Sequence, residues 1–375
     1  MTRVKFFLTP YYIPDNYSPE AIALAEGLFE LGVEVCANID YWFCYKKSDF
    51  VLKKSDSKEY DIAVYDYKYL YHSKKWTFNY IDTSKINVLI DRNDWLDQEW
   101  RDTRVMEKFD YILIDHMIKG FNYPENVKPW AIGLTNRVKN YIDKIEVDID
   151  LVAKKRILIN ARVKHNLRKK IQESLKQNIP KEYEIADLIS DPIESLYAKG
   201  EATENDINYH KESAGRHNPQ YYSMINNYLM TNCVGGYYEY KPFVTTPYSN
   251  LKKARRKLYF FLDKYLSLVH GDARRANFVF QYDSFRFWEV MYSHSCPIHL
   301  NFDYWGFILP VQPVSGKHYI GITDLDCVEF TKYVTELSAE DIRQIGEQGR
   351  DWCINNYTPS AVATRFIKMA KETKG

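Results

Sequence analysis

The sequence lacks the features that mark several classes of protein. Its six cysteines are scattered along 375 residues without the paired spacings of a zinc site, so nothing predicts a metal. No apolar run reaches the roughly 20 residues that a membrane-spanning helix needs. The chain begins directly with a strand pattern rather than a secretory leader. We therefore expect a soluble, cytoplasmic protein without a transmembrane segment.

A strong charge of either sign is also missing. The chain carries 51 Lys and Arg against 50 Asp and Glu, so its formal net charge of +1 gives no general attraction for nucleic acid or an anionic membrane. It contains no internal repeat and no low-complexity tract. Tyrosine is abundant, with 32 residues. Tyrosine rings stack on sugars and bases, although a coding bias would enrich the residue equally.

The first 150 residues alternate between strand and helix patterns. Residues 4–8 predict a strand, Ser18 and Pro19 predict the cap and first position of a helix, and residues 33–36 predict a second strand. Short apolar segments at residues 62–64, 88–90 and 111–114 predict strands that are buried on both faces. This alternation is typical of a doubly wound α/β sheet.

Carboxylates stand at the ends of these predicted strands. Asp91 follows residues 88–90, Asp115 follows residues 111–114, and Asp15 lies in the first loop. Ligands of doubly wound sheets bind beyond the carboxyl ends of the strands. With Arg92 beside it to keep it ionised, Asp91 is our candidate for a base that deprotonates a hydroxyl. The alternative is that Asp91 caps a helix predicted over residues 94–106.

A second strand and helix series follows a charged linker at residues 139–150. Its first predicted strand, residues 156–160, leads into a loop that carries Arg162 and a helix start that carries Arg168. An arginine fork pairs two phosphate oxygens at once, whereas basic residues at a helix start oppose the helix dipole. The two arginines are therefore candidates for an anion site. A solvated basic helix start is the alternative. Residues 200–250 are the least readable, and we expect helix and loops there.

The most informative stretch covers residues 282–300. Asp283 or Ser284 can cap a helix whose apolar residues recur at helical spacing from Phe287 onward. Arg286 lies in its first turn and Glu289 one turn later. A helix start with an arginine binds anions, and a nearby carboxylate can hold the two hydroxyls of a ribose. The pattern predicts a nucleotide site, with an ordinary amphipathic surface helix as the alternative.

The run from Arg286 to Pro297 resembles the donor-binding helix of GT-B glycosyltransferases, in the form found in exostosin-like enzymes and phage DNA glucosyltransferases. Many relatives carry a second glutamate eight residues before Glu289, where this chain has Gln281. The resemblance implies the GT-B fold, with two Rossmann-like doubly wound domains facing an interdomain cleft. It implies an acceptor domain over residues 1–150, a nucleotide-sugar domain over residues 151–355, and a helix within residues 356–375 that crosses back to the first domain.

The resemblance also implies an activity and a donor site. The chain would move a hexosyl or pentosyl group from a UDP- or GDP-linked donor, with no further cofactor. Glu289 would hold the ribose, while Arg162, Arg168, Arg286 and the helix start at Ser284 would neutralise the leaving diphosphate in place of a metal ion. A strand over residues 266–270 would place His270 and Gly271 at the donor cleft.

The implied chemistry centres on Asp91. Phage DNA glucosyltransferases carry a similar Asp-X-Arg after a strand, with the aspartate as catalytic base, so Asp91 is the expected base and transfer would invert the anomeric centre. A saccharide or other glycan is our first expectation for the acceptor. Modified DNA is the second, since phosphate contacts need more basic charge than this chain carries. A non-catalytic sugar-binding module is a third alternative.

Two other motifs point to different chemistry. His270-Gly271-Asp272, followed by Asn277, resembles the catalytic loop of aminoglycoside and choline kinases. Those kinases need a glycine-rich lid and a strand lysine upstream, which the first half does not offer, so a phosphotransferase is the less favoured alternative. Asp324-Leu325-Asp326 imitates the metal-binding motif of GT-A enzymes. It opens a predicted helix after a predicted strand, so we expect capping instead.

Overall fold

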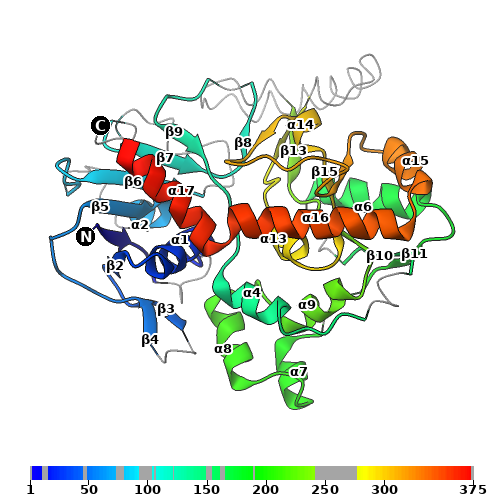
Figure 1. Cartoon of the computed structure of the whole chain (residues 1–375), viewed down its shortest axis with the longest axis horizontal. Coiled ribbons are helices and arrows are strands. Elements are labelled where there is room, and N and C mark those ends of the chain that lie inside the picture. The colour runs from blue at the N-terminus through cyan, green and yellow to red at the C-terminus, as the bar shows by residue number, and fades with distance from the viewer. Residues whose placement is uncertain are drawn as a thin grey trace, which may run out of the picture.

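The computed structural model describes residues 2–10, 16–44, 49–72, 80–92, 104, 107–120, 122–148, 154–160, 165–188, 191–240 and 277–372, and the statements below concern these residues. Figure 1 shows the arrangement of their helices and strands. In chain order these are β1 (Arg3–Phe7), α1 (Pro19–Glu30), β2 (Glu34–Ala37), β3 (Tyr41–Cys44), β4 (Asp49–Leu52), β5 (Ile62–Asp66), α2 (Tyr67–His72), β6 (Ile86–Asp91), β7 (Tyr111–Ile114), β8 (Met117–Ile118), β9 (Val127–Pro129), α4 (Asn136–Ile142), β10 (Arg156–Leu158), α6 (Asn166–Asn178), β11 (Glu184–Ala186), α7 (Ile193–Ala198), α8 (Glu204–Glu212), α9 (Pro219–Asn226), β12 (Met230–Asn232), β13 (Tyr237–Tyr240), β14 (Asn277–Phe280), α13 (Phe285–Tyr292), β15 (Cys296–Leu300), α14 (Phe302–Trp305), β16 (Phe307–Ile308), β17 (Ile320–Ile322), α15 (Val328–Glu336), α16 (Ala339–Tyr357) and α17 (Pro359–Glu372).

The first half of the chain forms a six-stranded sheet in the order β2-β1-β5-β6-β7-β9. All of its strand pairs are parallel. Every residue of β5 and β6 is buried, as expected for strands that are covered on both faces. The strands predicted at residues 62–64, 88–90 and 111–114 are confirmed.

The second half forms a five-stranded sheet in the order β11-β10-β12-β15-β17, again with parallel pairs throughout. Its central strand β12 lies in the region where we predicted only helix and loops. Another part of that region, β13, pairs antiparallel with β14. The prediction of only helix and loops is therefore wrong there. These strands have only three or four residues, and distant partners stabilise them rather than a local pattern.

Helix α13, which carries Arg286 and Glu289, is buried in the second core. Four of its side chains, Phe287, Trp288, Val290 and Met291, have no exposed surface. Burying one such side chain stabilises a fold by about 1.5–3 kcal/mol. This free energy fixes the position of the helix, and therefore the position of the polar residues at its start.

The last two helices connect the halves. Figure 1 shows α16 lying along the second half and α17 lying across the first. Val362, Ala363 and Phe366 of α17 belong to the same buried cluster as Ile22 and Leu24 of α1. The two helices approach closely at Gly27, where an added Cβ atom would lie 1.8 Å from the Pro359 carbonyl oxygen.

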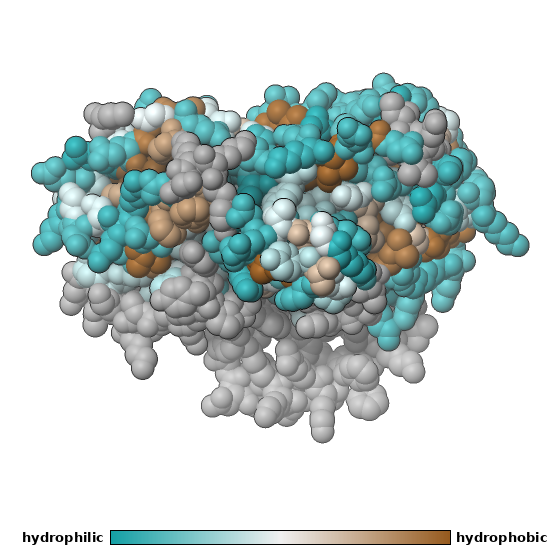
Figure 2. All heavy atoms as spheres, turned by 90° about the horizontal axis from the view of Figure 1, so that it is seen from below, coloured by the Kyte–Doolittle hydropathy of each residue, from teal (hydrophilic) through white to brown (hydrophobic). Residues whose placement is uncertain are grey.

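The surface is mixed rather than apolar. On the face seen from below in Figure 2, the coloured residues are mostly hydrophilic and the hydrophobic ones form separate small patches. Within the described ranges, no helix is long and apolar enough to cross a membrane.

Gly27→Ala should destabilise the protein. Alanine gains up to about 1 kcal/mol of helix propensity over glycine, but overpacking costs about 1–3 kcal/mol, and a backbone carbonyl cannot rotate away as a side chain does. We expect a lower midpoint of urea-induced unfolding. Lys368→Ala, on the exposed side of α17, is the control and should change the free energy of unfolding by no more than about 0.5 kcal/mol. An unchanged or raised midpoint for Gly27→Ala would contradict the close packing of α1 and α17.

Candidate active site

The topology of the two sheets marks where a ligand binds. In the first sheet, β2 lies on one side of β1 and β5 on the other. In the second sheet, β11 and β12 flank β10 in the same way. In open parallel sheets this reversal of strand order leaves a crevice beyond the carboxyl ends of the two central strands. The candidate site therefore lies at the ends of β1 and β5 and at the ends of β10 and β12.

Two of the predicted arginines meet the start of α13 at the second crevice. Arg168 Nε donates to the Val234 carbonyl oxygen at 3.3 Å. The guanidinium of Arg286 lies 5.0 Å from the ring centre of Tyr221. Burial raises the pKa of Tyr221, and the positive charges of Arg286 and Arg168 oppose that rise. The charges of Arg168 and Arg286 are therefore both felt at Tyr221, so the two arginines lie near each other.

The helix start itself is capped as predicted. Ser284 is the N-cap of α13, and its hydroxyl accepts a hydrogen bond from the Phe287 amide at 3.4 Å. Gly235 lies beside it, since a Cβ atom added there would be 3.5 Å from both Arg168 Nη2 and Ser284 Cβ. The chain after β12 thus runs between an arginine and a helix start, the two features that bind anions.

Polar atoms at this crevice are buried without a hydrogen-bond partner. They are Nη1 of Arg286, Nδ2 of Asn232 and Oδ1 of Asn160. Asn160 and Asn232 lie at the ends of β10 and β12, and Arg286 Nη2 is 3.5 Å from the Asn160 carbonyl oxygen. Buried polar groups are nearly always paired, so the two unpaired donors, Arg286 Nη1 and Asn232 Nδ2, are what an anionic ligand would satisfy.

Glu289 lies one turn further along α13 and is buried. Oε1 of this carboxylate is 2.6 Å from His217 Nδ1, and the Tyr222 hydroxyl donates to the same oxygen at 3.4 Å. The other ring nitrogen of His217, Nε2, is 3.0 Å from the Tyr17 hydroxyl. Tyr17 belongs to the first half of the chain, so a continuous path of hydrogen bonds runs from α13 of the second half into the first.

This path determines the orientation of Glu289. An ionised carboxylate can only accept hydrogen bonds, so His217 Nδ1 must carry a proton when Glu289 is charged. In the neutral imidazole, Nε2 then accepts from the Tyr17 hydroxyl. His217 and Tyr222 both contact Oε1 of Glu289. The second oxygen is the one that is available to a ligand.

The first crevice holds a cluster of buried carboxylates around one arginine. Arg92 Nε lies 2.8 Å from Asp66 Oδ2, and the Ser18 hydroxyl donates to that same oxygen at 2.7 Å. Ser18 is the N-cap residue of α1, as we predicted, but its side chain makes no capping hydrogen bond and is directed to Asp66 instead. Asp91, at the end of β6, has no exposed surface. Arg92 forms an ion pair with Asp66, which ends β5, the strand next to β6 and Asp91.

Glu20, in the first turn of α1, belongs to the same cluster. Burial raises the pKa of Glu20 to about 7, partly offset by the charge of Arg92 and by a hydrogen bond with Asp115. Two carboxyl groups can share a hydrogen bond only if one of them holds a proton. One carboxyl group of this crevice therefore remains protonated near neutral pH. Among the residues that the structure describes, no group of His, Cys, Asp or Glu side chains is placed to hold a metal ion.

A second set of contacts joins the two crevices. Asp283, which precedes α13, accepts a hydrogen bond from the Ile132 amide at 2.9 Å, and its own amide donates to His116 Nδ1 at 3.1 Å. His116 follows β7 of the first sheet. Asp283 was predicted as a possible helix cap, but Ser284 has that role and Asp283 holds the helix start against the first half.

The structure describes only some of the predicted site residues. Ser284, Arg286, Glu289 and Arg168 lie together at the second crevice. Asp91 lies at the carboxyl edge of the first sheet. Other predicted residues, Asp15, Arg162, His270, Gly271 and Asp272, lie outside the described residues. The capping prediction for the Asp-X-Asp motif is confirmed, because Asp324 Oδ2 accepts from the Val328 amide at 2.7 Å.

Several residues of the site were not found from the sequence. His217 and Tyr222 contact Glu289 from 72 and 67 positions away, and Tyr17 contacts His217 from 200 positions away. Asp66 ends a strand that we predicted only to residue 64. The position of Asp66 after a buried strand is the one signal that could have revealed it, since Asp91 was found in the same way.

Replacing Glu20 with glutamine should flatten the dependence of stability on pH. The pKa of Glu20 is higher in the folded protein, about 7, than its ordinary value of 4.5, so the folded state binds more protons between these values. Stability is then full below pH 4.5 and falls as pH rises toward 7, by an upper bound on the order of 3 kcal/mol.

The measurement is urea unfolding at pH 5 and pH 8. We expect Glu20→Gln to lose less stability over this interval than the unmodified chain. Glu336→Gln, on the exposed side of α15, controls for the loss of one carboxylate. Equal losses in all three proteins would show that Glu20 is already ionised at pH 5.

Comparison with known proteins gives a fold. No family model matches the sequence, and no curated protein matches it. Solved structures match over nearly the whole chain. An alpha-glucosyltransferase in complex with UDP and a 13-mer DNA containing an HMU base has a TM-score of 0.52 at 10% identity, covering 98% of both chains. The alpha-glucosyltransferase AGT in complex with UDP has a TM-score of 0.51 at 10% identity, covering 99% of this chain and 100% of the other.

A third similar structure is the Anabaena protein HepE in complex with UDP and glucose. Its TM-score is 0.50 at 9% identity, over 99% of this chain and 100% of the other. The likeness covers both sheets at once, in agreement with the two parallel sheets and the crossing of α17 onto α1. The chain has the GT-B fold of glycosyltransferases, as the sequence predicted.

Proposed function

We propose that this protein is a glycosyltransferase that moves a sugar from a nucleotide-sugar donor to a hydroxyl of a saccharide acceptor. One observation carries the proposal: Arg168, Arg286 and the Ser284-capped start of α13 converge where unpaired buried donors line the second crevice. Several structures that share the fold hold UDP at TM-scores of 0.50 to 0.52, which supports a uridine nucleotide as the first donor to test.

The leaving diphosphate would lie at the start of α13. Two guanidinium groups and the free amides of the first turn would stabilise its charge, which grows as the sugar bond breaks. Charge-assisted hydrogen bonds of this kind contribute about 1.5–3 kcal/mol each. This arrangement needs no divalent ion, and metal-independent transfer is part of the proposal. Arg162, His270 and Gly271, outside the described residues, would complete the same donor site.

The ribose would lie against Glu289. His217 and Tyr222 hold one oxygen of this carboxylate, so its second oxygen is presented in a fixed direction. A carboxylate that is held in this way loses less conformational freedom when it binds a ligand. His217 is therefore a positioning residue in this proposal, and its link to Tyr17 makes the donor contact depend on the first half of the chain.

Asp91 is the proposed catalytic base. It ends β6 of the first sheet. In this proposal it would remove the proton of the acceptor hydroxyl while the sugar is attacked from the side opposite the diphosphate, with inversion. Because Asp91 is fully buried, the acceptor would reach it only after the crevice opens. Opening and closing around substrate is common in enzymes whose site lies between two domains.

The acceptor is the least constrained part of the proposal. A net charge of +1 favours a saccharide over DNA. DNA is the second candidate, because one structure of the same fold contains a DNA 13-mer with an HMU base. The transfer of a phosphoryl group by the His270-Gly271-Asp272 loop is a weaker alternative, and the next measurement tests it.

UDP should bind without a metal ion. Isothermal titration in the presence of EDTA should give heat with UDP, and Arg286→Ala should weaken the affinity roughly 10- to 100-fold, which corresponds to about 1.5–3 kcal/mol. Arg343→Ala, an exposed arginine on α16, is the matched control and should leave the affinity unchanged. Binding of ATP with magnesium but of no nucleoside diphosphate would favour a phosphotransferase.

Asp91→Asn should stop transfer while leaving donor binding intact. A general base contributes about 10²- to 10⁴-fold in rate, and asparagine keeps the size of the buried side chain. The assay is UDP release from UDP-glucose in the presence of a panel of saccharides, with UDP affinity measured in parallel. Asp303→Asn, on the exposed side of α14, is the control. Loss of UDP binding in Asp91→Asn would remove Asp91 from the catalytic role.

A further inference from the structure

Arg286, the side chain proposed to contact the leaving diphosphate, is held in place by few polar contacts. Its Nη2 donates to the Asn160 carbonyl oxygen at 3.5 Å, which is longer than the roughly 2.7–3.2 Å of an ordinary N–H···O hydrogen bond. Its Nη1 is buried without a partner. Among the residues that the structure describes, no carboxylate forms an ion pair with this guanidinium. One long hydrogen bond does not fix the direction of so flexible a side chain.

The ring of Tyr221 is the other contact of this guanidinium. Arg286 Cζ lies 5.0 Å from the ring centre, inside the distance of about 6 Å at which the face of an aromatic ring attracts a cation. Tyr221 is 8% exposed, and the attraction is stronger where water is excluded. The Tyr221 hydroxyl is buried without a hydrogen-bond partner, so the ring and not the hydroxyl makes the contact. Arg286 itself is only partly buried, which leaves part of it open to a ligand.

Helix α9 fixes the position of Tyr221. The N-cap residue Asn218 accepts from the Gln220 amide at 3.0 Å, and Pro219 occupies the first helical position, as is favoured at a helix start. Ile225, one turn further along, has no exposed surface and belongs to the second core together with Tyr221. The ring of Tyr221 therefore lies on a helix that is capped at its start and buried on its inner side.

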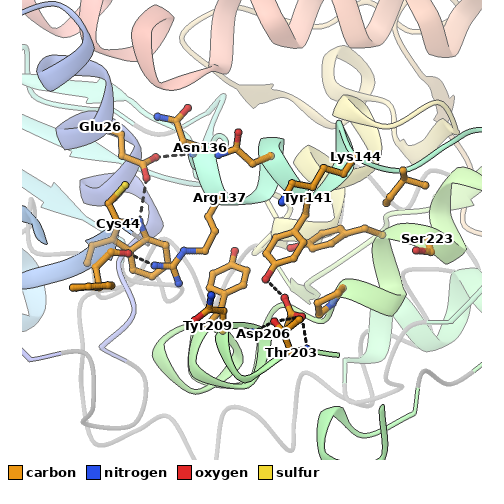
Figure 3. Close-up of a pocket in the computed structure, with 17 residues that line it drawn as sticks. Glu26, Cys44, Asn136, Arg137, Tyr141, Lys144, Thr203, Asp206, Tyr209 and Ser223 are labelled. Atoms are coloured by element: carbon orange, nitrogen blue, oxygen red, sulfur yellow. Dashed lines mark hydrogen bonds between the residues drawn. The ribbon is translucent and has the colours of Figure 1, made fainter. Parts of the chain in front are cut away.

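Three consecutive residues of α9 face different neighbours, because successive residues of a helix are about 100° apart around its axis. Tyr221 contacts Arg286, and the Tyr222 hydroxyl donates to Glu289 Oε1 at 3.4 Å. Ser223 is exposed and lines a cavity of about 540 Å³ that Tyr222 also borders (Figure 3). The start of α9 thus contacts both side chains of α13 that are proposed to bind the donor.

We propose that Tyr221 is a positioning residue for Arg286, and that the neighbouring pair Tyr221 and Tyr222 sets the separation between the phosphate contact and the ribose contact of α13. Arg286 and Glu289 stand at positions i and i+3, which are neighbours on a helix surface. A guanidinium that is stacked on a fixed ring loses less freedom when it binds a phosphate. The inference rests on the proposed donor site, and adds that α9 forms this site before the nucleotide binds.

The test is a double-mutant cycle in which UDP affinity is measured by isothermal titration in EDTA. Tyr221→Leu should weaken UDP binding roughly 3- to 30-fold, the range for a cation–π contact between exposed and desolvated settings. Tyr221→Phe should keep the affinity, because the ring face remains. In the Arg286→Ala background, Tyr221→Leu should cause no further loss, since the two residues act as one unit. Tyr221→Leu should also leave the affinity for uridine, which carries no phosphate, unchanged.

Tyr228→Leu is the matched control. Tyr228 is also buried, with 3% exposed surface, and the Arg156 guanidinium lies 4.5 Å from its ring centre. Arg156 stands at the amino end of β10, away from the crevice at the carboxyl end, so this change should lower stability and keep the UDP affinity. Ser223→Ala controls for a change in α9 that does not face α13. Tyr221→Met, whose flexible side chain fills irregular space, is measured beside Tyr221→Leu so that one folded variant is enough.

Three results would overturn the inference. The first is an unchanged UDP affinity in the leucine and methionine variants of Tyr221 while Arg286→Ala weakens binding. The second is an equal loss in Tyr221→Phe, which would assign the effect to the hydroxyl. The third is a further loss from Tyr221→Leu in the Arg286→Ala background, or an equal loss of uridine affinity, as a general distortion of the site would produce. An unmodified chain that binds no UDP would instead overturn the proposed function, and this inference with it.

Discussion

The hydrogen-bonded path from Glu289 through His217 to Tyr17 is the contact on which the arrangement of the site depends. All three side chains are buried, and in a buried setting a hydrogen bond is electrostatically stronger and a broken one more costly. Asp283 adds contacts to Ile132 and His116 beside it. The start of α13 is therefore held in position from both halves of the chain, which matters because a ligand in the crevice must contact both.

The two crevices differ in charge, and the difference fits their proposed roles. At the second crevice, Arg168 and Arg286 supply positive charge next to a helix start, which favours an anion. At the first, the carboxylates of Glu20 and Asp66 lie near Arg92, and Asp91 is buried at the end of β6. Burying this much negative charge is unfavourable, and the raised pKa of Glu20 shows how the fold responds, by retaining a proton. These charges are what the proposed donor site and the proposed proton-accepting site would each need.

The sequence was most informative where local chemistry and periodicity agree. The strands at residues 88–90 and 111–114 could be predicted because a strand that is buried on both faces must be apolar and β-branched. The start of α13 could be predicted because a cap, an arginine and a carboxylate lie within six residues of each other. Prediction was weakest for β12 and for the β13–β14 pair, whose few residues form strands only because distant partners supply their hydrogen bonds.

The sequence by itself therefore determined the doubly wound character of the first half and the capped start of α13 at Ser284, since both follow from patterns within one segment. Tertiary structure decided the rest. It paired the Ser18 hydroxyl with Asp66 instead of with the amides of α1, and it paired Arg92 with Asp66. It also brought His217 and Tyr222 into hydrogen-bonding distance of Glu289. These partners lie tens to hundreds of positions apart, and no local preference selects them. They are chosen because a buried polar group must find a partner, and packing of the core decides which one is in reach.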